Sequence, residues 1–155
     1  MKKQTILISA ACCAALMASL AWADGVPMPR TVPVAYTQEC GACHLAFPPG
    51  LLPAASWQRV MAGLGRHYGT DASLDAGTAQ PIGAWLQANA GTYKRVREEP
   101  PQDRITQSNW FLRKHREVAP DVFRRVSIKS AANCAACHGG ADQGNFSEHA
   151  VRIPK

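Results

Sequence analysis

Hydrophobic residues recur at helical spacing in three parts of this sequence, and no part shows the alternation of apolar and polar residues that is typical of a β-strand. The first helical pattern begins near Ser56, a suitable N-cap, and ends at Gly65 or Gly69. Its stripe lies within one arc of the helix and consists of Trp57, Val60, Met61, Leu64 and His67. The pattern predicts a helix that carries a histidine on its apolar side.

A second helix is predicted for residues 78–89. Its apolar face consists of Ile82, Trp85, Leu86 and Asn89. Gly91 is the expected C-cap. Pro81 is expected within the first turn, because a proline further inside a helix removes a hydrogen bond.

The third predicted helix is short. Ser108 is a suitable N-cap for it, and it must end before Pro120. Phe111 and His115 lie four positions apart and therefore share a face. Three other stretches are dominated by proline, glycine or charged residues. They predict an N-terminal lead at residues 24–34, a loop at residues 48–50 and a charged linker at residues 94–104. The predicted fold class is mostly α with extensive loops.

The first 23 residues have the features of a secretory signal peptide. Lys2 and Lys3 precede an uncharged apolar run at residues 5–20, and Ala21-Trp22-Ala23 is an A-x-A cleavage signal. The alternative is an uncleaved membrane anchor, although the run is slightly short for spanning a bilayer. No later stretch reaches that length. We therefore expect residues 24–155 to form a mature protein in the periplasm.

The composition changes this picture little. With 46% hydrophobic and 18% charged residues, the 155-residue chain resembles a globular protein of one or two small domains. Removal of the signal peptide lowers the formal net charge from +6 to +4, because it takes away Lys2 and Lys3 and no acidic residue. We expect no nucleic-acid partner, since such binding needs a concentrated basic surface.

The four cysteines outside the signal peptide lie in two C-x-x-C-H motifs, Cys40-Gly41-Ala42-Cys43-His44 and Cys134-Ala135-Ala136-Cys137-His138. This motif is typical of covalent haem c attachment. Its two thiols can bond to the two vinyl groups on one edge of a porphyrin, and the histidine that follows can then bind the iron as the proximal ligand. We therefore expect two covalently attached haem c groups.

Three other interpretations of the cysteines are weaker. Disulfides are the usual state in exported proteins, but they do not explain the spacing. A zinc site built from two C-x-x-C pairs has no use for the histidines. A redox C-x-x-C motif would lie near a βαβ pattern, and the sequence shows none. Haem also accounts for the size, because about 66 residues per site are marginal for a self-sufficient apolar core.

The ligand on the other side of each iron decides whether a haem moves electrons or binds small molecules. His67 and His115 are the favoured distal ligands, because both lie on helical segments with apolar neighbours, although each could instead be an exposed helix residue. Met61 shares the stripe of His67 and is its rival, but a methionine there is more often a packing residue. His149 lies in a polar tail and Met28 in the proline-rich lead.

Several longer motifs cover nearly all of the mature sequence. They are residues 39–53, Trp57 with His67-Tyr68-Gly69, Trp110-Phe111 with Lys114-His115-Arg116, residues 129–138, and Val151-Arg152-Ile153-Pro154. Through them the chain resembles the small periplasmic dihaem cytochromes c of bacteria. The resemblance implies an N-terminal unit similar to class I cytochrome c, which we place at residues 24–92, and a more extended C-terminal haem unit at residues 93–155.

The resemblance also implies the iron ligands. His44 and His138 match the proximal positions, and His67 and His115 the distal positions. We pair His67 with the first haem and His115 with the second, because each is nearer in sequence to that site.

Bis-histidine ligation implies a low-potential electron carrier that is not an enzyme. Its expected partners are other redox proteins, with a small monohaem oxygen-binding cytochrome and a membrane cytochrome b donor as candidates. The alternative function is that of a haem enzyme or gas-binding protein with one open iron site for peroxide, oxygen or nitric oxide chemistry.

Overall fold

The computed structural model describes residues 25–155, so the expected signal peptide lies outside the described residues. Its α-helices are α2 (Val34–Gly41), α3 (Ala54–Ala62), α4 (Ala76–Ala88) and α5 (Asn109–Lys114). Short 3₁₀ helices occupy Pro49–Leu51, Leu64–Arg66, Lys94–Val96, Pro101–Asp103, Ile105–Gln107, Val122–Arg124, Cys134–Ala136, Ala141–Gln143 and Glu148–Ala150. No β-strand occurs in residues 25–155, which confirms the mostly α fold with extensive loops. None of the described helices is long and apolar enough to cross a membrane.

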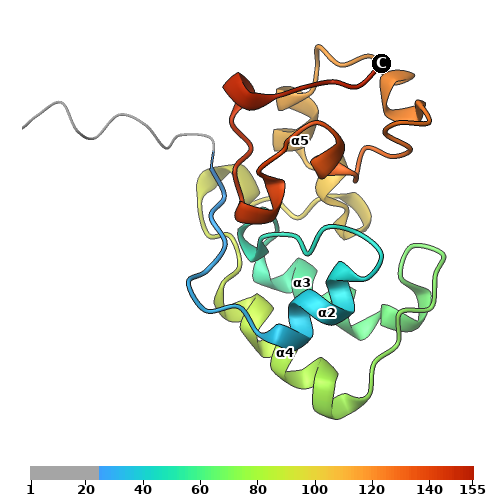
Figure 1. Cartoon of the computed structure of the whole chain (residues 1–155). Coiled ribbons are helices and arrows are strands. Elements are labelled where there is room, and N and C mark those ends of the chain that lie inside the picture. The colour runs from blue at the N-terminus through green and yellow to red at the C-terminus, as the bar shows by residue number, and fades with distance from the viewer. Residues whose placement is uncertain (1–24) are drawn as a thin grey trace, which may run out of the picture.

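The apolar core has two parts. Figure 1 shows α2, α3 and α4 together in one half of the molecule, and α5 with the C-terminal segments in the other. The first cluster lies among α2, α3 and α4 and contains Tyr36, Leu52, Trp57, Ile82 and Leu86. The second lies around α5 and contains Val26, Leu51, Trp110 and Phe111. Phe47 and Ile105 pack against both clusters, so the two halves share part of their core.

The N-terminal segment ties the two halves together. The amide of Val26 donates a hydrogen bond to the carbonyl oxygen of Gly144 at 3.1 Å. The Val26 side chain is only 2% exposed and belongs to the second cluster. The segment therefore runs from the C-terminal half towards α2 in the N-terminal half (Figure 1).

The helix expected to carry His67 is shorter than predicted. It begins at Ala54, directly after Pro53, and Ser56 lies inside it instead of capping it. Gly63 ends α3, and His67 follows a separate 3₁₀ helix, Leu64–Arg66. The prediction that His67 lies on the helix was therefore wrong, because the chain turns at Gly63 and delivers His67 on a loop.

The second predicted helix also has different ends. Asp75 caps α4 with its side chain, so the helix begins at Ala76, two residues before the predicted start. Pro81 lies beyond the first turn, so its expected placement was wrong. Asn89 is the C-cap instead of Gly91. Gly91 is required for another reason, since a Cβ atom there would lie 2.3 Å from Cγ2 of Val96.

The third helix follows the prediction. The Ser108 hydroxyl accepts a hydrogen bond from the amide of Phe111 at 3.1 Å, and α5 ends at Lys114. The stretch 94–104, expected as a charged linker, is instead packed. It contains two 3₁₀ helices, and Val96 and Pro100 within it are buried.

Candidate functional site

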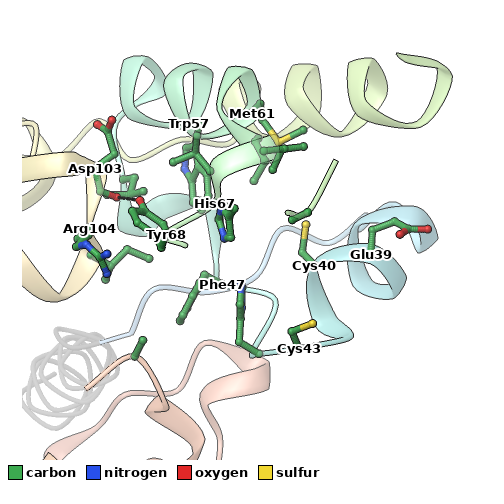
Figure 2. Close-up of a pocket in the computed structure, with 18 of the residues that line it drawn as sticks. Glu39, Cys40, Cys43, Phe47, Trp57, Met61, His67, Tyr68, Asp103 and Arg104 are labelled. Carbon is green, nitrogen blue, oxygen red and sulfur yellow. Dashed lines mark hydrogen bonds between the residues drawn. The ribbon is translucent and has the colours of Figure 1, made fainter. Parts of the chain in front are cut away.

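The first C-x-x-C-H motif borders a cavity of about 340 Å³. Cys40 lies in the last turn of α2, and Cys43 and His44 follow the end of this helix. Figure 2 shows the two cysteines on one side of the cavity and His67 on the other. The apolar walls include Leu52, Trp57, Val60, Met61, Leu64 and Leu86.

The first histidine pair, His44 and His67, lies in this cavity. The ring centroids are 6.1 Å apart, and the ring planes differ by 24°. Nδ1 of His44 lies 2.7 Å from the carbonyl oxygen of Leu45. A carbonyl can only accept, so this contact places the proton on Nδ1 and leaves Nε2 as the metal-binding atom. Phe47, which also lines the cavity, stacks on His44 with a centroid distance of 5.0 Å.

His67 is held by a tight loop. Its amide donates to the carbonyl oxygen of Leu64 at 3.2 Å, and its carbonyl accepts from the amide of Thr70 at 3.1 Å. Tyr68 and Gly69 then both have positive φ angles, 52° and 101°. Gly69 can adopt this angle without a steric cost, whereas Tyr68 cannot.

A polar network borders the same cavity beside His67. The Tyr68 hydroxyl donates to the carbonyl oxygens of Gln102 and Asp103 at 3.1 and 3.0 Å. Arg59 donates to both carboxylate oxygens of Asp103, at 2.9 and 2.7 Å, and thereby lowers the pKa of Asp103. The Arg104 guanidinium lies over the Tyr68 ring, 4.2 Å from its centroid. No local sequence pattern indicates the roles of these residues, because they lie far apart along the chain.

The second C-x-x-C-H motif borders a separate cavity of about 420 Å³. Cys134 begins the 3₁₀ helix Cys134–Ala136, and Cys137 follows its end. The amide of His138 donates to the carbonyl oxygen of Cys134 at 2.8 Å. His115, just after α5, reaches the same cavity. The apolar walls include Leu51, Phe111, Phe123, Ile128, Phe146 and Val151.

The second histidine pair, His115 and His138, has the same separation and a different orientation. The ring centroids are again 6.1 Å apart, but the planes differ by 78°. Nδ1 of His115 lies 3.0 Å from the carbonyl oxygen of Phe111. The rings of His115 and Phe111 also stack, with a centroid distance of 3.9 Å. Nδ1 of His138 is buried and has no hydrogen-bond partner among the described residues.

Several histidine and cysteine side chains of the two cavities have shifted pKa values. Burial lowers the pKa of His67 and of His138, and a second histidine nearby adds to the effect, so both favour the neutral form that binds metal ions. Burial raises the pKa of the Cys40 thiol, and that of Cys134 to about 11.

The competing metal and disulfide arrangements find no support. The four described cysteines form no disulfide. Residues 25–155 also contain no cluster of three or more His, Cys, Asp or Glu side chains that could hold a metal ion.

The remaining candidate ligands differ in position. His149 is exposed on the 3₁₀ helix Glu148–Ala150. Met28 packs against the first apolar cluster, and neither residue lines a described cavity. Met61 does line the first cavity. It is also a packing residue, because its side chain packs against the first apolar cluster.

The residues of both cavities fit a haem. An imidazole nitrogen binds a metal ion at roughly 2 Å and the ring centroid lies about 1 Å further, so two imidazoles on opposite sides of one ion have centroids roughly 6 Å apart. Both histidine pairs have this separation. Each cavity is largely apolar and has a C-x-x-C pair at its edge, as a covalently attached porphyrin requires.

Comparison with known proteins points the same way. Residues 36–146 match the family model described as dihaem cytochrome c. The dihaem cytochrome c of Shewanella baltica OS155 has a similar solved structure, with 36% identity and a TM-score of 0.69 over 79% of this chain and 95% of that one. A dihaem cytochrome c of Rhodobacter sphaeroides is 42% identical, with a TM-score of 0.65 over 75% of this chain and 98% of that one. No curated protein sequence matches the chain.

Proposed function

This chain belongs to the dihaem cytochrome c family, and we propose that it is an exported electron carrier of low reduction potential. Its cofactors are two covalently attached haem c groups, and membership of the family supports electron transfer as its general role. The observation that carries the finer proposal is the pair of facing imidazoles, 6.1 Å apart, in each cavity.

We assign the ligands by cavity. Cys40 and Cys43 hold the first haem, and Cys134 and Cys137 hold the second. The first histidine pair binds the first iron, with His67 as the distal ligand. The second histidine pair binds the second iron in the same way, with His115 as the distal ligand.

The bound haems supply iron that exchanges one electron at a time. The protein fixes the ligands around them. Carbonyl oxygens of Leu45 and Phe111 accept from Nδ1 of His44 and His115, so each Nε2 atom is aimed at the metal position. The walls of both cavities are largely apolar. Two imidazole ligands per iron favour a lower potential than one imidazole and one thioether, which supports the low-potential assignment.

The cellular setting is part of the proposal. The features of residues 1–23 support export to the periplasm, where haem c proteins mature. Residues 24–155 would then exchange electrons with other redox proteins. We propose a membrane cytochrome b as the donor and a small monohaem oxygen-binding cytochrome as the acceptor, and we propose no enzymatic activity.

Carbon monoxide tests the ligation, because it binds ferrous haem only where a coordination position is open. We expect the dithionite-reduced wild-type protein to show no change in its Soret spectrum on addition of carbon monoxide. His67→Ala and His115→Ala should each open one haem, so each should give about half the change of the double variant. His149→Ala is the matched control and should behave as wild type. A full-sized change in the wild-type protein would contradict bis-histidine ligation and favour gas binding.

A further inference from the structure

Three residues with unusual backbone angles meet beside the first cavity. Tyr68, Gln102 and Asp103 have positive φ angles of 52°, 56° and 56°. Residues with a Cβ atom rarely adopt such backbone angles, and these angles persist only where surrounding contacts hold the backbone in place. The contact between them is the Tyr68 hydroxyl, which donates to the carbonyl oxygens of both Gln102 and Asp103.

We call the contact of Tyr68 with Gln102 and Asp103 the junction. It connects the loop of His67 to the rest of the protein from two sides. Arg104 covers the Tyr68 ring at 4.2 Å. The Asp103 carboxylate is held in turn by Arg59 of α3. Figure 2 shows Tyr68 between His67 and the segment that carries Asp103 and Arg104. A chain of contacts therefore runs from α3 through Asp103 and Tyr68 to the loop.

The loop needs such support more than the segments of His44 and His115 do. Nδ1 of His44 and of His115 is fixed by a backbone carbonyl oxygen. Within the described residues, the His67 side chain makes no hydrogen bond, and its ring contacts Tyr68 and His44 at centroid distances of 4.8 and 6.1 Å. The position of its ring therefore depends on its loop backbone and on Tyr68.

We propose that Tyr68 is a positioning residue that keeps His67 on the first iron in both oxidation states, an inference that rests on the ligation assigned above. Without the hydroxyl, the strained backbone at positions 68, 102 and 103 can relax and the loop can move away from the cavity. The first haem would then open on reduction and accept a small neutral ligand. The junction thus decides whether this site only carries electrons or also binds gases.

The test compares two tyrosines in the haem-loaded protein. Tyr68→Phe removes the hydroxyl at the junction. Tyr93→Phe is the matched control, because Tyr93 is similarly exposed, at 39% against 43%, and its hydroxyl also donates to a backbone carbonyl oxygen, that of Gly50 at 2.7 Å. The readouts are the carbon monoxide difference spectrum of the reduced protein and the two reduction potentials.

We expect wild type and Tyr93→Phe to stay closed, and Tyr68→Phe to bind carbon monoxide at one of its two haems. The spectral change should equal that of His67→Ala and should not increase when the two substitutions are combined. Only one of the two reduction potentials should shift. Arg59→Gln, which weakens the support of Asp103 without touching the loop, should give a smaller change in the same direction and provides a second variant if Tyr68→Phe matures poorly.

The outcomes separate this inference from the proposed function. If wild type is closed, His67→Ala opens, and both Tyr68→Phe and Arg59→Gln remain closed with unchanged potentials, the positioning role is wrong and the ligation stands. Opening of both haems by Tyr68→Phe would also refute the role, because it would mean general loosening. If wild type itself binds carbon monoxide at the first haem, both proposals fail.

Discussion

Replacement of Gly144 by alanine should destabilise the protein strongly. Gly144 has a φ angle of +73°, and a Cβ atom there would lie 2.2 Å from the carbonyl oxygen of Val26 and 3.0 Å from Cα of Pro27. Both contacts are with backbone atoms, which cannot move aside as a flexible side chain can. The alanine must therefore displace the N-terminal segment.

The size of the effect follows from what is displaced. The left-handed backbone costs an alanine about 1–2 kcal/mol. Loss of the hydrogen bond from the Val26 amide to Gly144 costs about 1 kcal/mol. Exposure of the Val26 side chain, which is 2% exposed in the folded protein, costs about 1.5–3 kcal/mol. We therefore expect the free energy of unfolding to fall by about 3.5–6 kcal/mol, the sum of these contributions.

Urea unfolding of the haem-loaded protein, followed by far-UV circular dichroism, measures this change, and two other glycines separate its causes. Gly69 has a φ angle of +101° with no atom within 4 Å of a Cβ position, so Gly69→Ala should show only the conformational cost of about 1–2 kcal/mol. Gly139 has neither feature, so Gly139→Ala should change stability by less than about 0.5 kcal/mol. Equal losses for Gly144→Ala and Gly69→Ala would refute the packing argument.

Two further predictions concern acid stability and magnetic spectra. Because hydrogen bonds from Arg59 lower the pKa of Asp103, its carboxylate stabilises the fold above the unfolded value of about 4 and this contribution is lost as the pH falls below it. The urea midpoint of Asp103→Asn should therefore fall less than that of wild type between neutral pH and pH 3. The exposed control Asp121→Asn should show the same fall as wild type. Identical pH profiles for wild type and Asp103→Asn would contradict the stabilising role of the Asp103 carboxylate. The oxidised protein should give two different low-spin electron paramagnetic resonance signals, because ring planes 24° apart split the iron d orbitals more than planes 78° apart. The more anisotropic signal should disappear in His115→Ala, and a single type of signal from both irons would contradict the described ring orientations.

Local patterns predicted the parts of the protein that depend on neighbours in sequence. The C-x-x-C-H motifs and the Ser108 cap of α5 are such cases, since all the atoms involved lie within a few residues. The packing of His115 on Phe111 follows from the same short spacing.

Contacts between distant segments were not predictable in this way. The helix pattern extended through His67 because the apolar residues continue at helical spacing, but the chain turns at Gly63. The charge of residues 94–104 suggested a linker, whereas Asp103 and Glu99 in fact pair with Arg59. Tyr68 binds backbone carbonyl oxygens, which any residue could provide, so only the glycine that follows it hinted at an unusual loop.

The contact between Val26 and Gly144 also sets an order of events during synthesis. About 120 residues separate these two positions, and at ~5–20 residues per second the second emerges on the order of ten seconds after the first. During that interval the amide of Val26 has no native hydrogen-bond acceptor, although Leu51 of the same apolar cluster has already been made. The segment that starts the described chain is therefore among the last to reach its final place, and the protein closes only when its C-terminal haem region has been made.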